Sequence, residues 1–181
     1  QRYKSFTGYF ISRYGTRLQK VVVDAGFSCP NRDGTTGTGG CTYCDNSAFN
    51  PSYCSPLKSI RQQVLEGIEF HAKRYRRAQQ FLAYFQPFSN TYADIEKLHQ
   101  LYTEALGVEG VVGISVSTRP DCFNRDTAEL LACIAKTKVV MLELGIESVR
   151  DKTLQRINRG HDFECTKKAF ALAAEYGLFV T

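Results

Sequence analysis

The sequence has no apolar run long enough to cross a bilayer. Its apolar stretches, such as Val139–Leu142 with its neighbours, fall well short of the roughly 20 residues that a spanning helix needs. It also has no basic start followed by an apolar stretch and a small-residue cleavage site, so no secretory signal is visible. These absences predict a cytoplasmic protein with no membrane partner.

Low-complexity segments, linkers and internal repeats are also missing. The 181 residues, 43% of them hydrophobic and 23% charged, suit one globular domain with one core. The net charge of +5 permits an anionic partner without requiring one. Basic and aromatic residues mix in residues 2–20, a pattern that serves RNA binding but that also describes a solvated face over packed rings. The charge pattern leaves both interpretations open.

Short apolar runs alternate with amphipathic stretches along the chain. We expect buried strands at Leu18–Ala25, Gln80–Gln86, Val111–Ser117 and Lys138–Gly145, and the start of a fifth at Leu178–Thr181. We expect helices at Ser59–Arg76, Ala93–Leu106, Thr127–Lys136 (with Asp126 as N-cap), Asp151–Ile157 and Phe163–Tyr176 (stopped by Gly177). This alternation predicts an α/β fold with a parallel sheet and right-handed crossovers. A fifth strand that has only begun indicates a portion of a larger barrel or partial barrel.

Seven cysteines are an odd number for a disulfide framework, and three of them fall within Cys29–Cys44. In a chain without an export signal, such clustering indicates metal binding. The spacing is Cys29-x11-Cys41-x2-Cys44, in a loop rich in glycine. This loop directly follows the first predicted strand, and parallel sheets carry their chemistry at the carboxyl ends of strands.

The cysteines allow two kinds of site. Three thiolates on a four-iron cluster leave one iron open to a ligand. Alternatively, Cys54 follows Cys44 after nine residues and closes a four-thiolate zinc site. The second interpretation predicts a zinc-stabilised RNA-binding module without catalytic activity. The position after a first strand favours catalysis.

The loop resembles that of radical S-adenosylmethionine (SAM) proteins, in which a three-cysteine motif follows the first barrel strand. The long gap between the first two cysteines resembles the YhcC-like branch, itself similar to the radical SAM domain of the elongator catalytic subunit. The matching segments are VDAGFSCPNRDG, GTGGCTYC, YFQPFSNTYA, STRPDCF, ELGIES and INRGHDF. The resemblance implies a partial TIM-type (β/α)6 barrel of which residues 1–181 are the amino-terminal portion, cut after four to five strands. Residues 1–17 would be an extension and residues 26–56 the cluster-binding loop.

The resemblance also implies a set of cofactor contacts. Cys29, Cys41 and Cys44 would bind a [4Fe-4S] cluster whose open iron takes the amino and carboxylate groups of SAM. Tyr43 is the aromatic residue before the last cysteine. Glu147 would reach the ribose hydroxyls, and Arg159 would pair with the SAM carboxylate, as bidentate guanidinium pairing favours. A structural Glu147–Arg159 ion pair is the alternative.

Further contacts are expected at two other strand ends. Ser89 and Asn90 stand where the superfamily often has a Gly-Gly-Glu-type turn; an ordinary turn with Asn90 capping the next helix is the alternative. Ser117 stands where related enzymes often have a carboxylate. Arg119 either orients a ligand or pairs with Asp121 on the surface. Cys54 and Cys122 are weaker candidates for a second metal; Cys122 lies beside Asp121.

The activity implied by the resemblance is reductive cleavage of SAM to a 5′-deoxyadenosyl radical that acts on an unidentified substrate. Similarity to the elongator domain suggests tRNA as that substrate. An electron donor protein is a second expected partner. Because the remaining strands of such a barrel lie beyond residue 181, we expect weak or no turnover from these residues alone.

Overall fold

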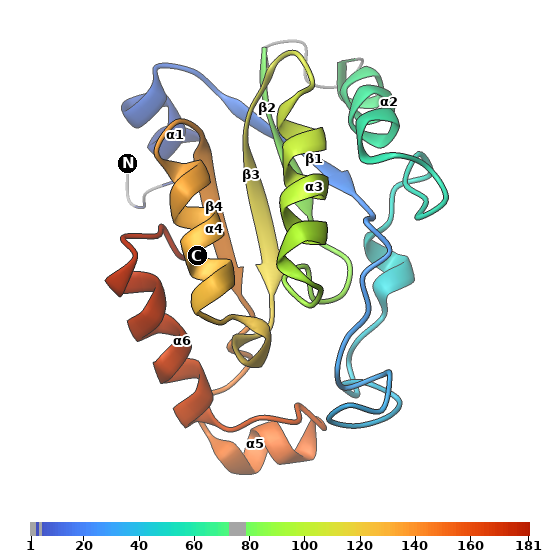
Figure 1. Cartoon of the computed structure of the whole chain (residues 1–181), viewed down its shortest axis with the longest axis vertical. Coiled ribbons are helices and arrows are strands. Elements are labelled where there is room, and N and C mark those ends of the chain that lie inside the picture. The colour runs from blue at the N-terminus through green and yellow to red at the C-terminus, as the bar shows by residue number, and fades with distance from the viewer. Residues whose placement is uncertain (1–2, 4, 73–78) are drawn as a thin grey trace.

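A computed structural model describes residue 3, residues 5–72 and residues 79–181, apart from the side chains of residues 47 and 49. Four parallel strands alternate with helices in it (Figure 1). The strands are β1 (Leu18–Val23), β2 (Gln80–Phe85), β3 (Val111–Thr118) and β4 (Val139–Leu144), and they lie in the order β1-β2-β3-β4. The predicted α/β fold with a parallel sheet is therefore confirmed.

Three of the helices cover one face of the sheet. The helices are α1 (Phe6–Tyr14), α2 (Ile60–Ala72), α3 (Ile95–Leu106), α4 (Arg125–Ala135), α5 (Asp151–Arg156) and α6 (Phe163–Glu175), with short 3-10 turns η1 (Asn46–Phe49) and η2 (Pro120–Cys122). Three of them, α2, α3 and α4, pack on β1, β3 and β4 respectively and on one another. No helix in the described part of the chain is long and apolar enough to cross a membrane.

The main core lies between the sheet and these three helices. Alternate strand residues face it, among them Val21, Phe85 and Ile114, which are fully buried. Phe85 meets Tyr102 of α3 edge to face, with ring centroids 5.0 Å apart. Burial of each such side chain contributes about 1.5–3 kcal/mol, so this layer fixes the strands and hence the loops at their carboxyl ends.

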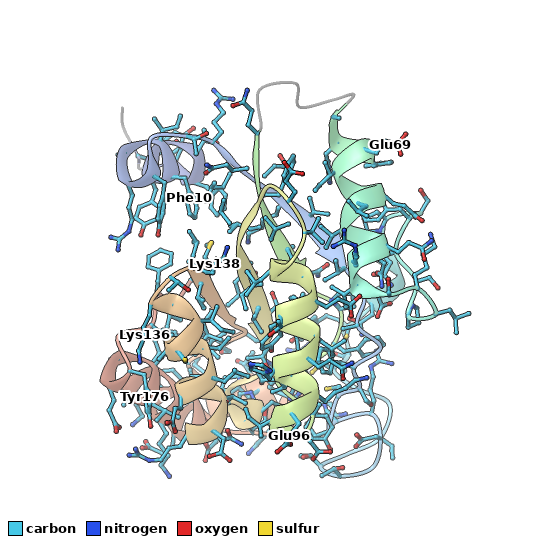
Figure 2. The ribbon with its side chains drawn as sticks, turned by 45° about the horizontal axis from the view of Figure 1, so that its top comes forward. Phe10, Glu69, Glu96, Lys136, Lys138 and Tyr176 are labelled. Carbon is cyan, nitrogen blue, oxygen red and sulfur yellow. The ribbon has the colours of Figure 1, made fainter. Side chains whose placement is uncertain are left out.

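The opposite face of the sheet, here called the inner face, is covered at its amino end by α1. Phe10 of α1 is 1% exposed and packs on Leu18, Leu82 and Met141. Figure 2 shows Phe10 lying beneath α1. The helix begins at Ser5, whose side chain accepts from the Gly8 amide at 3.0 Å. This helix was not predicted, although Phe6, Phe10 and Tyr14 recur at four-residue spacing and their rings pack in sequence along it.

Most predicted element ends agree with the structure to within two or three residues. The Asp126 N-cap prediction is wrong: Asn124 accepts from the Thr127 amide and forms a reciprocal capping box with Thr127. The η2 turn brings the chain into the helix earlier than the apolar pattern shows, which leaves Asp126 in the first turn. The predicted extension of α2 to Arg76 lies outside the described residues.

The end of the chain agrees with the predicted start of another strand. Gly177 follows α6 with a φ of +64°, a conformation that glycine adopts without strain. Val180 then forms a parallel bridge with Leu142, and the Thr181 amide donates to the Leu142 carbonyl at 2.9 Å. Residues 178–181 thus run beside β4.

Candidate cluster and cofactor site

The cysteine loop leaves β1 and turns back on itself. The Cys29 carbonyl accepts from the amides of Arg32 and Asp33 at 2.8 and 3.1 Å. The Cys44 amide donates to the Cys41 carbonyl at 3.0 Å, so these two cysteines share one tight turn. The preceding Gly40 has a φ of +77°, which a residue with a side chain rarely adopts.

The loop is bound to the segment that follows α5. The Asn158 side chain donates to the Gly40 carbonyl at 2.8 Å, and the Thr42 amide donates to the Ile157 carbonyl at 3.0 Å. Asn31 donates in return to the Asn158 carbonyl. Residues more than a hundred positions apart therefore form one unit at the carboxyl ends of the strands.

Donor groups surround the sulfur of Cys41, a residue that is 8% exposed. Asn31 Nδ2 lies 3.6 Å from it, Arg159 Nη1 3.7 Å and Arg119 Nη1 3.9 Å. Asn46 Nδ2 lies 3.5 Å from the Cys44 sulfur. Positive charge and N–H groups stabilise thiolates and the anionic clusters that thiolates hold. The donor set therefore fits an iron–sulfur cluster.

Arg159 connects the cysteine loop to the end of β4. Its guanidinium is buried and donates through Nη2 to the Gly145 carbonyl at 2.6 Å and through Nη1 to the Tyr43 hydroxyl at 3.4 Å. Its Nε donates to His161 Nε2 at 3.0 Å. Because His161 Nε2 accepts this hydrogen bond, it carries no proton. Burial lowers the pKa of His161, in agreement with a neutral ring.

A cavity of about 290 Å³ opens between these groups. It is lined by five of the residues predicted to contact the cofactor: Tyr43, Ser117, Arg119, Glu147 and Arg159. Cys44 lines it as well, together with Glu143 and Gly145 at the end of β4. The structure thus brings one of the predicted cluster cysteines and most of the predicted SAM contacts to one hollow.

Ser89 and Asn90 do not line this cavity. Asn90 is fully buried, and its Nδ2 donates to the carbonyls of Pro87 and Ser117 at 3.0 and 2.9 Å. It joins the ends of β2 and β3 and does not cap α3, whose N-cap is Asp94. Ser89 is 1% exposed, and its hydroxyl has no hydrogen-bond partner among the described residues.

Glu147 lies in the loop after β4 with a φ of +60°. Glu147 is exposed to solvent. It is not enclosed in the barrel interior, where an unpaired charge would be costly. Among the residues that the structure describes, no ion pair joins Glu147 to Arg159, so the structural ion pair considered from the sequence is not formed. The carboxylate faces the same cavity as Tyr43.

A polar network on the inner face was missed by the sequence reasoning. Glu143 of β4 accepts from Tyr84 at 2.7 Å and from Ser115 and Ser117 at 2.8 Å each, and it pairs with Lys20 of β1. Burial alone would raise the pKa of Glu143, but the hydrogen bonds from Lys20 and Tyr84 outweigh it and hold that pKa below its usual value. The alternation of strand residues was the signal available, because it places all these side chains on one face.

Burial disfavours the thiolate form of Cys54 and Cys122, the two further metal candidates. Cys54 donates to the Val22 carbonyl at 3.2 Å, and burial raises its pKa to about 12. Burial also raises the pKa of Cys122 to about 12. Within the described ranges, no three His, Cys, Asp or Glu side chains gather around one possible ion position. A four-iron cluster takes one thiolate per iron and therefore does not need its cysteines around a single point.

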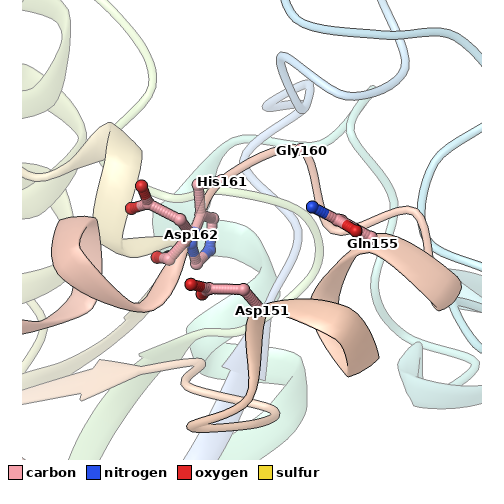
Figure 3. Close-up of a pocket in the computed structure, with 5 residues that line it drawn as sticks. All are labelled: Asp151, Gln155, Gly160, His161 and Asp162. Atoms are coloured by element: carbon pink, nitrogen blue, oxygen red, sulfur yellow. Dashed lines mark hydrogen bonds between the residues drawn. The ribbon is translucent and has the colours of Figure 1, made fainter.

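A second hollow, of about 430 Å³, is lined by Asp151, Gln155, Gly160, His161 and Asp162 (Figure 3). Both carboxylates accept a hydrogen bond from a backbone amide: Asp151 from Phe163 and Asp162 from Cys165, each at 2.8 Å. Asp162 is thus the N-cap of α6. His161 lines this hollow and also accepts from Arg159 Nε.

A parallel sheet with a three-cysteine loop after its first strand, and a cavity at the strand ends, defines a partial-barrel α/β protein. The family model of the radical SAM superfamily matches residues 33–181. The chain therefore belongs to the radical SAM superfamily. Cys29 lies just before the matched residues.

The chain is similar to two bacterial proteins over almost its whole length. It is 41% identical to protein YhcC of Escherichia coli over 97% of this chain and 55% of that protein. It is 34% identical to the uncharacterized protein YtqA of Bacillus subtilis over 99% and 56%. The chain thus spans about half the length of the curated relatives it matches. Both the YhcC-like resemblance and the superfamily assignment are confirmed.

Solved structures share the fold. Elp3 of the archaeon Methanocaldococcus infernus superposes with a TM-score of 0.56 at 18% identity, over 91% of this chain and 37% of that one. At this identity the match shows the architecture alone. It confirms the predicted partial barrel and its likeness to the elongator domain.

Proposed function

We propose that the chain is the amino-terminal portion of a radical SAM enzyme core in which Cys29, Cys41 and Cys44 bind a [4Fe-4S] cluster. The observation that carries the proposal is the cavity beside Cys44, which gathers Tyr43, Arg159 and Glu147 at the carboxyl end of the sheet. When bound, the cluster and SAM supply a 5′-deoxyadenosyl radical by one-electron reductive cleavage.

The residues of the chain hold and orient these groups. Arg159 offers a guanidinium to the SAM carboxylate, and the Gly145 carbonyl and His161 fix its direction. Glu147 faces the cavity with a carboxylate suited to accepting from ribose hydroxyls. Asn31 and Asn46 donate toward the sulfurs of Cys41 and Cys44, which favours the thiolate form that binds iron.

The test is anaerobic reconstitution with iron and sulfide, followed by EPR of the dithionite-reduced protein before and after SAM is added. We expect about four irons per chain and a signal that changes with SAM. Cys44→Ala should lose the cluster, and Cys54→Ala should keep it. Tightly held zinc that depends on Cys54, with no cluster signal, would instead support the zinc-binding RNA module.

The substrate and partners are part of the proposal. A nucleic acid such as tRNA is the proposed substrate class, and an electron donor protein in the cytoplasm is the proposed reductant source. Binding of tRNA, measured by gel shift across a salt series, should weaken as salt rises because phosphate contacts release counterions. A tRNA that neither binds nor changes deoxyadenosine formation in the intact protein would remove this substrate class.

A further inference from the structure

Arg119 is held in one orientation by two partners. It is 3% exposed, and its Nε and Nη2 donate to the Asp121 carboxylate at 2.8 and 2.7 Å. Nη2 also donates to the Arg159 carbonyl at 2.7 Å. The Nε–Nη2 edge of the guanidinium therefore faces Asp121. The remaining nitrogen, Nη1, is directed at the Cys41 sulfur 3.9 Å away.

This arrangement leaves Arg119 little capacity to bind a ligand. A guanidinium has five N–H groups; hydrogen bonds to oxygen use three of them, and Nη1, which carries the other two, is directed at Cys41. The distance from Nη1 to sulfur is long for a hydrogen bond, so the main influence on Cys41 is the positive charge. Asp121 sits on the opposite edge of the guanidinium and offsets part of that charge from farther away.

We propose that Arg119 is a positioning residue that sets the reduction potential of the cluster through Cys41, with Asp121 as the group that orients it and moderates its charge. The inference rests on the proposed function. Reduction adds an electron to an already anionic cluster, so a nearby positive charge stabilises the reduced form and raises the potential. A nearby negative charge lowers the potential.

The pair predicts opposite shifts for two substitutions. Arg119→Met should lower the midpoint potential and Asp121→Asn should raise it, while Arg119→Lys should stay closer to the unchanged protein because the charge is kept. The expected size is a roughly tenfold change in the ratio of reduced to oxidised cluster at a fixed potential, or about 59 mV for one electron. EPR-monitored redox titration of the intact reconstituted protein measures it without any turnover.

Arg125→Met is the matched control. Arg125 also pairs with a carboxylate, Glu175, but that pair is exposed, with side-chain exposures of 67% and 52%. Its potential should equal that of the unchanged protein. If Arg119 had a purely structural role, Arg119→Met and Asp121→Asn would both lose cluster, and their potentials would not shift in opposite directions.

Each outcome decides one of the two proposals. Opposite shifts support the inference. Loss of cluster from both variants, or potentials equal to that of Arg125→Met, overturn it while the proposed function stands. If Arg119→Met does not fold, Asp121→Asn decides alone, since a potential that is unchanged or lower overturns the inference. A reconstituted parent protein with no cluster overturns the proposed function and this inference with it.

Discussion

Lys20 on β1 and Glu143 on β4 form an ion pair although two strands lie between them. In a flat sheet their strands would be about 14 Å apart, three times the usual strand spacing. The two side chains therefore reach toward each other across the inner face, over β2 and β3. Lys20 Nζ passes 4.2 Å above the Tyr84 ring on the way, which adds a cation–π contact.

Removing one member of this pair should destabilise the fold. Lys20→Met removes one hydrogen-bond donor from the Glu143 carboxylate. We expect the free energy of unfolding, measured by urea titration, to fall by about 1–3 kcal/mol. Lys20→Met/Glu143→Leu should cost less than the two single changes added together, because neither charge is left alone. Additive costs would contradict a direct interaction.

The network should also make stability depend on acid pH. The pKa of Glu143 in the folded protein lies below the ordinary value of 4.5, so the unfolded chain binds this proton more readily. Its stabilisation is then fully present above about pH 4.5 and is lost as pH falls through the lower folded value. Glu143→Gln should show a shallower loss of stability below pH 4.5 in a urea series over pH. Equal slopes for the two proteins would contradict this.

Gly145→Ala should weaken SAM binding with little effect on the fold. A Cβ at Gly145 would lie 2.9 Å from Arg159 Nη2 and 3.0 Å from Glu147 Oε1. Both neighbours are ends of long side chains, so they can move, but Arg159 then leaves the Gly145 carbonyl. We expect roughly tenfold weaker binding, about 1.4 kcal/mol, in calorimetry of the reconstituted protein.

Gly107→Ala provides the comparison for that change. Gly107 follows α3, and a Cβ there would come no closer than 3.4 Å to a neighbouring atom. Its SAM affinity should equal that of the unchanged protein. Equal affinity in Gly145→Ala would show that the direction of Arg159 does not matter for SAM.

Cys54→Ala should keep full iron content. The Cys54 thiol donates to the Val22 carbonyl and is held protonated by burial, so its loss removes one hydrogen bond, worth about 1 kcal/mol. Iron analysis after reconstitution and urea titration measure the two effects separately. Loss of iron together with unfolding would indicate that Cys54 is a metal ligand.

The strands and most helices were predictable because their side chains alternate or repeat with a clear period. The short α1 was not, since its buried anchor, Phe10, packs on residues of three strands, two of which lie far along the chain. The cysteine loop and Arg159 were found through motif resemblance. The role of Arg119 was not, because its pairing with Asp121 is local while its contact with Cys41 joins residues 78 positions apart. Ser89 and Asn90 were expected in the site from their position in sequence, yet the backbone turns them inward.

The hydrogen bond between Asn31 and the Asn158 carbonyl can form only after residue 158 has been synthesised. The two residues are 127 positions apart, and a ribosome that adds about 5–20 residues per second needs roughly 6–25 s to bridge that distance. For this interval the three cysteines emerge without the segment that shapes their loop. Insertion of the proposed cluster in the cell should accordingly follow translation of all four strands and of α5.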